Sequence, residues 1–291
     1  MLQTLKVGFL RRYFRFSAWL AWRSTRTPAN VEAVTLNTRA GPRPGRLYRG
    51  EQDAQRPLVV YFHGGGWVIG DLDTHDAYCL MLAQQSAATV VAVDYRLAPE
   101  AVFPAAQNDC LDAASDIATR IGEFGGNGQI VLAGDSAGGH LSLMSALNAD
   151  AELREKLSGI IATYPVADHY SQPYASYVEC ATGQALTMNL MRWFWDTYMG
   201  SAQPDAASIA QASPLRHPGL ATLPPLIGCT AGRDPLRDEG IALRDALKTA
   251  GVDVEYHHYP NSEHGFAGSM GATDDFNDWL QRCSDWIGRQ A

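Results

Sequence analysis

The chain is poor in cysteine, has no excess of positive charge and lacks a long apolar run. Its five cysteines are scattered over 291 residues and form no C-x-x-C pair, so we expect neither a disulfide framework nor a zinc site. No run of 18 apolar residues is present, which predicts no membrane-spanning helix. Arginines interrupt the N-terminal stretch that a signal peptide would need. These absences predict a cytoplasmic protein that needs no metal or other cofactor.

The charge is distributed unevenly along the chain. The formal net charge of −8 argues against general nucleic-acid binding, which favours basic surfaces. The first 30 residues, however, carry six basic residues and no acid, so the rest of the chain carries −14. Apolar residues spaced by three or four in this basic segment predict an amphipathic helix, with a stripe at Leu2, Leu5, Phe9, Tyr13, Phe16 and Leu20. We expect the stripe to pack on the rest of the protein; a weak contact of residues 1–26 with an anionic membrane surface is the alternative.

From residue 31 onward, short apolar segments alternate with helical ones. Asp73 or Thr74 is expected to cap the first of these helices, which would end near Gln85. This alternation predicts an α/β fold with a mostly parallel central sheet and helices on both faces. The expected strands are 31–36, 46–48, 58–62, 89–93, 130–133, 159–163, 226–230 and 252–259, and the other expected helices are 105–121, 137–147, 239–250 and 273–287.

One aromatic segment interrupts the alternation. Residues 168–213 are rich in tyrosine, tryptophan and methionine and lie between two expected strands, so they form either extra core or a lid over a ligand site. We therefore divide the chain into an N-terminal helical part of a cap (1–30), a first catalytic α/β segment (31–167), the cap insertion (168–213) and a second catalytic segment (214–291).

The sequence GDSAGGH at 134–140 follows an expected strand and precedes an expected helix. This is the context in which G-x-S-x-G places a serine on a sharp turn with its hydroxyl exposed. Ser136 would then be a nucleophile at a helix N-terminus, and the backbone N–H of Ala137 could donate to an oxyanion. A glycine-rich turn with an incidental serine is the structural alternative.

A second glycine-rich turn, HGGGW at 63–67, also follows an expected strand. Its backbone N–H groups have no side chains in front of them, and acyl transfer needs such donors because negative charge develops on the carbonyl oxygen. Since both turns follow strands, we expect them at the same edge of the sheet.

A serine nucleophile requires a base, and His264 is the best placed of the eight histidines because it lies just beyond the last expected strand. Asp234 lies in the turn after another strand and would orient that imidazole. Asp238 and Glu239 fit better as acids in the first turn of a helix. The order Ser136, Asp234, His264 is typical of α/β-hydrolases. We expect His140 to be structural, like Asp135 beside the nucleophile, and we attribute Asp71, Asp73, His75 and Asp76 to helix capping rather than to a metal site.

Five ordered motifs together resemble the hormone-sensitive lipase family of α/β-hydrolases, and more narrowly its bacterial carboxylesterases of the GDSAG type. They are HGGGW at 63–67, DYRLAPE at 94–100, GDSAGG at 134–139, DPLRDE at 234–239 and HGF at 264–266. The similarity spans about residues 57–290, and residues 186–195 resemble the cap segment of that family.

The resemblance implies an α/β-hydrolase fold with a helical cap formed by the N-terminal helices and the insertion. It also implies an oxyanion hole made by Gly65, Gly66 and Ala137, with Gly64 a less favoured donor. We expect substrate-binding residues in the cap and beside the oxyanion hole, namely Trp67, Trp193, Trp195 and Leu186. Relatives of this kind often form dimers, so a homodimer is an open alternative.

The function expected from these motifs is a serine carboxylesterase that hydrolyses short- to medium-chain esters through an acyl-enzyme on Ser136. A lipase acting on longer-chain lipid esters and another acyl-transfer enzyme, such as an amidase, are alternatives. A non-catalytic small-molecule receptor on the same fold is disfavoured because His264 is present in its motif.

Overall fold

The computed structural model describes residues 2–23, 31–50, 55–268 and 271–290. Its centre is an eight-stranded sheet in the order β1-β2-β4-β3-β5-β6-β7-β8. Strand β2 is antiparallel to both β1 and β4, and the strands from β4 to β8 are parallel. The predicted α/β fold is therefore confirmed. The strands are β1 Val31–Leu36, β2 Arg43–Arg49, β3 Leu58–Phe62, β4 Thr89–Val93, β5 Ile130–Asp135, β6 Leu157–Thr163, β7 Leu226–Arg233 and β8 Val254–Glu263.

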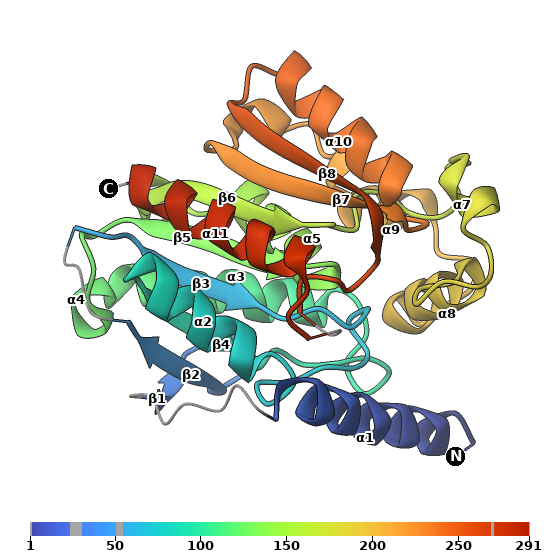
Figure 1. Cartoon of the computed structure of the whole chain (residues 1–291), viewed down its shortest axis with the longest axis horizontal. Coiled ribbons are helices and arrows are strands. Elements are labelled where there is room, and N and C mark those ends of the chain that lie inside the picture. Colours follow the sequence, from blue (N-terminus) through green and yellow to red (C-terminus); the bar gives the residue numbers. More distant parts are fainter. Residues whose placement is uncertain (1, 24–30, 51–54, 269–270, 291) are drawn as a thin grey trace.

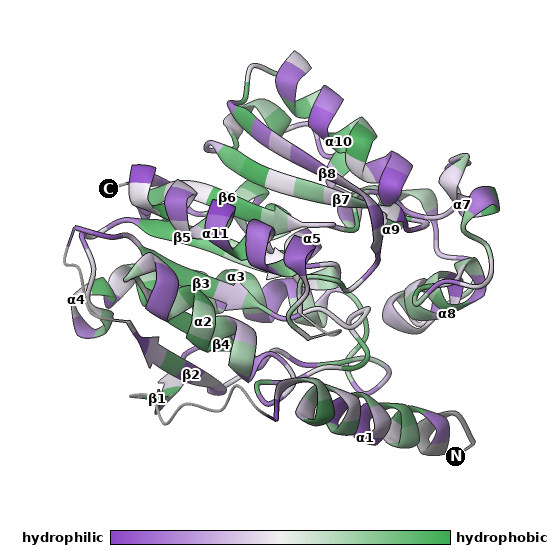
Figure 2. Ribbon diagram, viewed as in Figure 1, coloured by the Kyte–Doolittle hydropathy of each residue, from purple (hydrophilic) through white to green (hydrophobic). Residues whose placement is uncertain are grey.

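Helices cover both faces of this sheet, so its central strands are buried on two sides (Figure 1). Alternate residues of β3 enter different cores: Leu58 and Phe62 face one core, and Val59 and Tyr61 face the other. The first core includes α3 (Ala105–Thr119) and α5 (Ala137–Leu147), and the second includes α2 (Asp76–Ser86) and α11 (Asp274–Arg289). The mostly hydrophobic colour of β3 and β5 in Figure 2 reflects this two-sided burial.

Helices α1 (Leu2–Trp22), α7 (Ser176–Glu179) and α8 (Met188–Met199) gather at one end of the sheet (Figure 1). Helices α1 and α8 meet where the Lys6 ammonium lies 5.8 Å from the centroid of the Trp193 ring. The remaining helices are α4 Ile121–Phe124, α6 Ala151–Lys156, α9 Ala206–Gln211, α10 Arg237–Thr249 and the 3-10 turns η1 Pro214–Arg216 and η2 Leu220–Thr222.

The structure changes some predicted element ends. Helix α2 begins at Asp76, and neither Asp73 nor Thr74 caps it. Instead, Asp71 Oδ1 accepts hydrogen bonds from the N–H groups of Asp73 and Thr74, which closes a turn ahead of the helix. Strand β8 runs on to Glu263, and the predicted helix 105–121 is divided into α3 and α4.

Helix α1 packs on the protein as predicted, but not with the predicted stripe. The stripe side chains Phe9, Tyr13 and Phe16 are 72%, 60% and 58% exposed. The opposite face is buried through Val7, Ala18 and Trp22, and the Trp22 indole N–H donates to the Gly268 carbonyl at 2.7 Å. The side chains of residues 2–5, including Leu2 and Leu5, and residues 24–30 lie outside the described part of the chain.

Candidate active site

Ser136 lies on a tight turn between β5 and α5. Its φ of 54° is in the left-handed region, and its N–H donates to the Thr163 carbonyl at 2.9 Å. Glycines are required on both sides because the backbone segments nearly touch: a Cβ at Gly138 would lie 1.9 Å from the Phe62 carbonyl oxygen. A Cβ at Gly134 would lie 2.3 Å from the backbone of Gly138. The two glycines thus permit the strained turn that presents Ser136.

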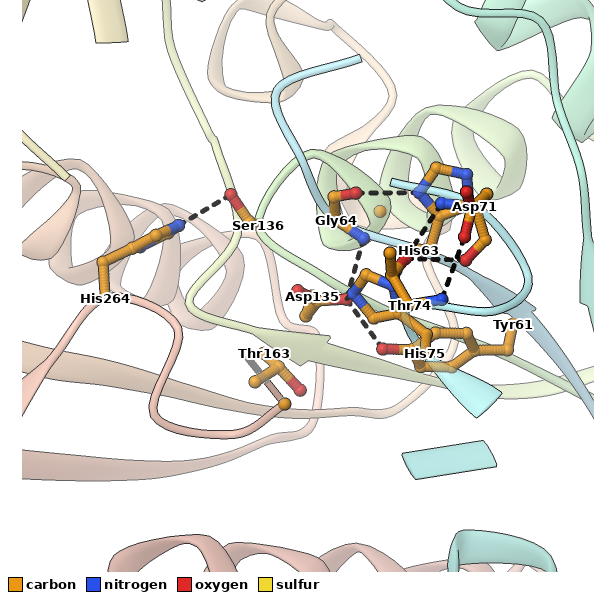
Figure 3. Close-up of polar contacts among 12 residues, drawn as sticks. Tyr61, His63, Gly64, Asp71, Thr74, His75, Asp135, Ser136, Thr163 and His264 are labelled. Atoms are coloured by element: carbon orange, nitrogen blue, oxygen red, sulfur yellow. Dashed lines mark hydrogen bonds and ion pairs between the residues drawn. The ribbon is translucent and has the colours of Figure 1, made fainter. Parts of the chain in front are cut away.

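The structure brings Ser136, His264 and Asp234 together from three separate strand ends. Ser136 Oγ lies 2.8 Å from His264 Nε2, and His264 Nδ1 lies 2.7 Å from Asp234 Oδ2 (the Ser136–His264 contact is drawn in Figure 3). Asp234 is fully buried, and its other oxygen accepts the Leu236 N–H at 2.9 Å. Asp234 follows β7, and His264 follows the last residue of β8.

This geometry selects one tautomer of His264. The nitrogen that faces the carboxylate, Nδ1, must hold a proton to donate to it, so Nε2 keeps a lone pair for the hydroxyl proton of Ser136. The three side chains therefore have the arrangement of a nucleophile, its base and the group that orients the base.

The HGGG turn lies next to Ser136, but its three glycines differ. The N–H of Gly64 donates to Asp135 Oδ1 at 2.9 Å, so that donor is already used. Gly65 and Gly66 line the cavity that also contains Ser136, and both have positive φ, 114° and 57°. Ala137 is the first residue of α5, so its N–H has no acceptor within the helix. Gly65, Gly66 and Ala137 thus remain the candidate oxyanion donors.

A cavity of about 290 Å³ opens above Ser136 and His264. Of the four residues expected to bind substrate, Trp67, Trp195 and Leu186 lie in its wall, but Trp193 lies outside the lining. Trp193 instead packs against Phe194, at 5.2 Å between ring centroids, and it is Phe194 that faces the cavity. Its other apolar walls come from α1 and α8 and the loops beside them, through Leu10, Tyr13, Phe14, Ile69, Val166, Leu190, Met191 and Leu236.

Tyr13 of this wall belongs to the predicted stripe, but Leu10 and Phe14 were missed in the sequence. They belong to a second series with helical spacing, Val7, Leu10, Phe14, Ala18 and Trp22, on the opposite side of the helix from most of the predicted stripe. Spacing alone does not show which of the two series faces the interior of the protein. The decisive contacts come from elsewhere: Arg11 Nε donates to the Val68 carbonyl at 2.8 Å, which turns this face inward.

The acidic residues near His75 are engaged in ion pairs. Asp71 pairs with Arg15, and Asp73 and Asp76 both pair with Arg46. Within residues 2–23, 31–50, 55–268 and 271–290, no group of three or more ligating side chains could hold a metal ion. The described residues also include no helix long and apolar enough to cross a membrane.

His140 is a structural residue in the nucleophile helix. Its Nδ1 accepts the Trp67 indole N–H at 3.2 Å, and its Nε2 donates to the Ala212 carbonyl at 2.7 Å. Burial lowers the pKa of His140 to about 4, so the ring stays neutral at neutral pH and keeps both contacts.

Residues 59–268 match the family described as the alpha/beta hydrolase fold. The chain is 39% identical over 245 residues to the esterase LipI of Mycobacterium tuberculosis, with 83% of this chain and 76% of that protein covered. The chain belongs to the hormone-sensitive lipase family of α/β-hydrolases.

Other members of this α/β-hydrolase family show similar likeness. An ethyl acetate hydrolase of Pseudomonas putida is 34% identical, with 91% of this chain and 84% of that protein covered. Among solved structures, an esterase of Pyrobaculum calidifontis has a TM-score of 0.89 at 38% identity, and the match covers 97% of this chain and 92% of the esterase chain. The metagenomic carboxylesterase EstE1 has a TM-score of 0.90 at 33% identity, and the match covers 98% of this chain and 97% of EstE1.

Proposed function

We propose that this α/β-hydrolase is a serine carboxylesterase that hydrolyses short- to medium-chain esters through an acyl-enzyme on Ser136. The observation that carries the proposal is the continuous hydrogen-bonded line from Asp234 through His264 to Ser136, which ends at an apolar cavity. The likeness to carboxylic ester hydrolases over most of the chain supports the same reaction.

In the first half-reaction, Ser136 Oγ forms a bond to the ester carbonyl carbon while His264 Nε2 takes the hydroxyl proton. The carbonyl π electrons move onto the oxygen, which the N–H groups of Gly65, Gly66 and Ala137 stabilise. When the tetrahedral intermediate collapses, the bond to the alkoxy group breaks and His264 returns its proton to the leaving alcohol. The acyl group is then esterified to Ser136.

In the second half-reaction, water replaces the alcohol. His264 takes a proton from the water as its oxygen bonds to the acyl carbon, and the same N–H groups stabilise the second oxyanion. Collapse breaks the bond to Ser136 Oγ, which recovers the proton from His264, and the carboxylic acid leaves. Asp234 remains a carboxylate throughout and stabilises the imidazolium in both halves.

The size of the cavity favours short- to medium-chain substrates. A volume of about 290 Å³ lies at the small end for a ligand pocket, and its wall is closed by aromatic side chains such as Phe194 and Trp195. We propose that α1 and residues 168–213 act together as the cap, since both contribute residues to this wall.

The test is hydrolysis of p-nitrophenyl esters from acetate to palmitate, with the wild type compared with Ser136→Ala. The proposal predicts activity that peaks at short or medium acyl chains, with a burst of p-nitrophenol that disappears in the variant. Near-normal turnover by the variant would refute the assignment of Ser136. A folded wild-type protein that is inactive at every chain length would instead support the receptor alternative.

One surface feature favours a second role, contact with anionic lipid. The side of α1 that faces solvent exposes Phe9, Phe16 and Trp19, while Arg12 on the same helix is also exposed. Aromatic residues beside cations suit the interface of an anionic bilayer, and Tyr13 places the mouth of the cavity next to this face.

Co-sedimentation with vesicles tests that role. We expect the wild type to pellet with phosphatidylglycerol vesicles and less with phosphatidylcholine vesicles, and Phe16→Ser combined with Trp19→Ser to remain in the supernatant. Equal sedimentation of the wild type and the variant would exclude this face as the contact.

A further inference from the structure

A buried polar cluster lies beside the oxyanion turn (Figure 3). Its centre is the carboxylate of Asp135, the residue before the nucleophile. Oδ1 of Asp135 accepts hydrogen bonds from the Tyr61 hydroxyl at 2.7 Å and from the Gly64 N–H at 2.9 Å. His75 Nε2 lies 3.3 Å from the same oxygen. Asp135 is 7% exposed and His75 is 4% exposed, so water does not replace these contacts.

The carboxylate of Asp135 fixes the position of Gly64. Besides accepting the Gly64 N–H, it lies so close that a Cβ at Gly64 would be 2.2 Å from Oδ2. The next two residues are Gly65 and Gly66, whose N–H groups are proposed oxyanion donors. The N–H groups of Gly65 and Gly66 belong to the two planar peptide units that directly follow Gly64. A shift of Asp135 would move Gly64 and would thereby change the direction of both donors.

Asp135 depends on its neighbours to stay charged and in place. Burial by itself raises the pKa of this carboxyl, but its interaction with His75 and the hydrogen bonds from His75 and Tyr61 outweigh burial and keep the pKa below its usual range. A carboxylate with these donors removed would be a costly buried charge and would turn toward another partner.

The proton on His75 Nε2 follows from the geometry. This nitrogen faces a carboxylate oxygen, so it must carry a proton in either protonation state of the ring. On the other side, Thr74 Oγ1 lies 2.9 Å from His75 Nδ1 and 2.8 Å from the Asp71 carbonyl oxygen, and its single proton serves one of these two contacts. The turn that holds Thr74 is attached to α1 through the pairing of Asp71 with Arg15.

We propose that His75 and Tyr61 are positioning residues for ester hydrolysis. They hold the Asp135 carboxylate on the Gly64 N–H and thereby keep the N–H groups of Gly65 and Gly66 aimed at the oxyanion. This inference rests on the proposed esterase function, and the wild-type burst tests that function separately.

A matched pair of substitutions at His75 isolates the relevant hydrogen bond. In His75→Gln, the side-chain amide reaches to the position of Nε2 and can still donate to Asp135. In His75→Asn, the shorter amide occupies the position of Nδ1 and loses that donor. We expect the Asn variant to lose about 10- to 100-fold in kcat with KM changed less than about twofold, because misdirected donors affect the transition state. The Gln variant should keep most of the activity.

A pair of inhibitors separates positioning from general loss of structure. A trifluoromethyl ketone forms a tetrahedral adduct with an oxyanion, whereas the matched methyl ketone binds mainly as the ground-state carbonyl. In His75→Asn, we expect the affinity for the trifluoromethyl ketone to fall by about as much as kcat, and the affinity for the methyl ketone to stay nearly unchanged.

Asp109→Asn is the control variant. Asp109 is also a fully buried carboxylate, but within the described part of the chain its side chain pairs with Arg96 and makes no hydrogen bond to residues 63–67. Its loss should therefore lower the melting temperature without changing kcat. Unchanged kcat in a folded His75→Asn protein overturns the proposal, as does an equal loss in the Gln and Asn variants. If His75→Asn fails to fold, Tyr61→Phe decides: it removes another donor to Oδ1, and an unchanged kcat there overturns the proposal.

Discussion

The substitution Asp234→Asn tests the roles of the three proposed catalytic side chains because the structure fixes how the new amide would lie. Asp234 Oδ1 accepts the N–H of Leu236 at 2.9 Å, and this backbone group cannot accept in return. An asparagine must therefore turn its oxygen to Leu236 and its NH₂ group to His264 Nδ1. Since Nδ1 would then have to accept, His264 would carry its proton on Nε2, next to Ser136.

That tautomer cannot take the proton from the Ser136 hydroxyl. In serine proteases with the same three groups, the equivalent change lowers kcat by about 10⁴-fold, which corresponds to about 5.4 kcal/mol of transition-state stabilisation. We expect a loss of that order here, because Asp234 is fully buried and water cannot supply the missing acceptor. The hydrogen bond to Leu236 is retained, so the free energy of unfolding should change by only about 1–2 kcal/mol.

The assay is the rate of the p-nitrophenol burst from p-nitrophenyl butyrate, measured by stopped flow, with urea unfolding as the control for folding. Substrate affinity should be nearly unchanged because Asp234 does not line the cavity. An Asp234→Asn protein that is folded and acylates within about tenfold of the wild-type rate would refute both the tautomer argument and the role given to Asp234.

Three further substitutions should change activity or stability because of contacts at the replaced residues. Gly66→Ala should lower kcat by about 10- to 100-fold, since its Cβ would lie 2.3 Å from the Phe194 ring and must displace the turn; steady-state kinetics at saturating ester check this. Phe194→Ala should move the preferred p-nitrophenyl ester to a longer acyl chain, because it removes a ring from the cavity wall; an unchanged profile would contradict the placement of that wall. Burial raises the pKa of Glu239 from 4.5 to about 8. Between pH 4.5 and about pH 8, this carboxyl is therefore protonated in the folded protein and ionised in the unfolded chain, and its contribution to stability is lost as the pH rises through this range. Urea midpoints from pH 5 to 9 should therefore fall less steeply in Glu239→Gln than in the wild type.

The residues of the candidate site could be found from the sequence because each stands directly after a strand. Parallel strands end at one edge of a sheet, so Gly65, Ser136, Asp234 and His264 meet there although they are distant in the chain. The glycines around Ser136 are also required sterically, because β3 approaches this turn too closely for a side chain. At these positions, the local sequence pattern and the order of the strands therefore predict the same site.

The parts that the sequence did not predict depend on contacts between distant elements. Helix α1 has two apolar faces, and the inward one is selected by Arg11 and Trp22 through carbonyl groups far along the chain. Similarly, Trp193 and Phe194 are adjacent in α8, and only packing against α1 and the oxyanion turn shows that Phe194 faces the cavity. The contact between His75 and Asp135 was hidden for the same reason, since the two residues are 60 positions apart in the chain.

The most direct test of the acyl-enzyme is intact-mass measurement of the protein quenched with acid during turnover of p-nitrophenyl butyrate. The account predicts a species heavier by one butyryl group, with the added mass on the peptide that contains Ser136, and no such species in Ser136→Ala. A butyryl group found on another residue, or formed equally in the variant, would contradict the central claim.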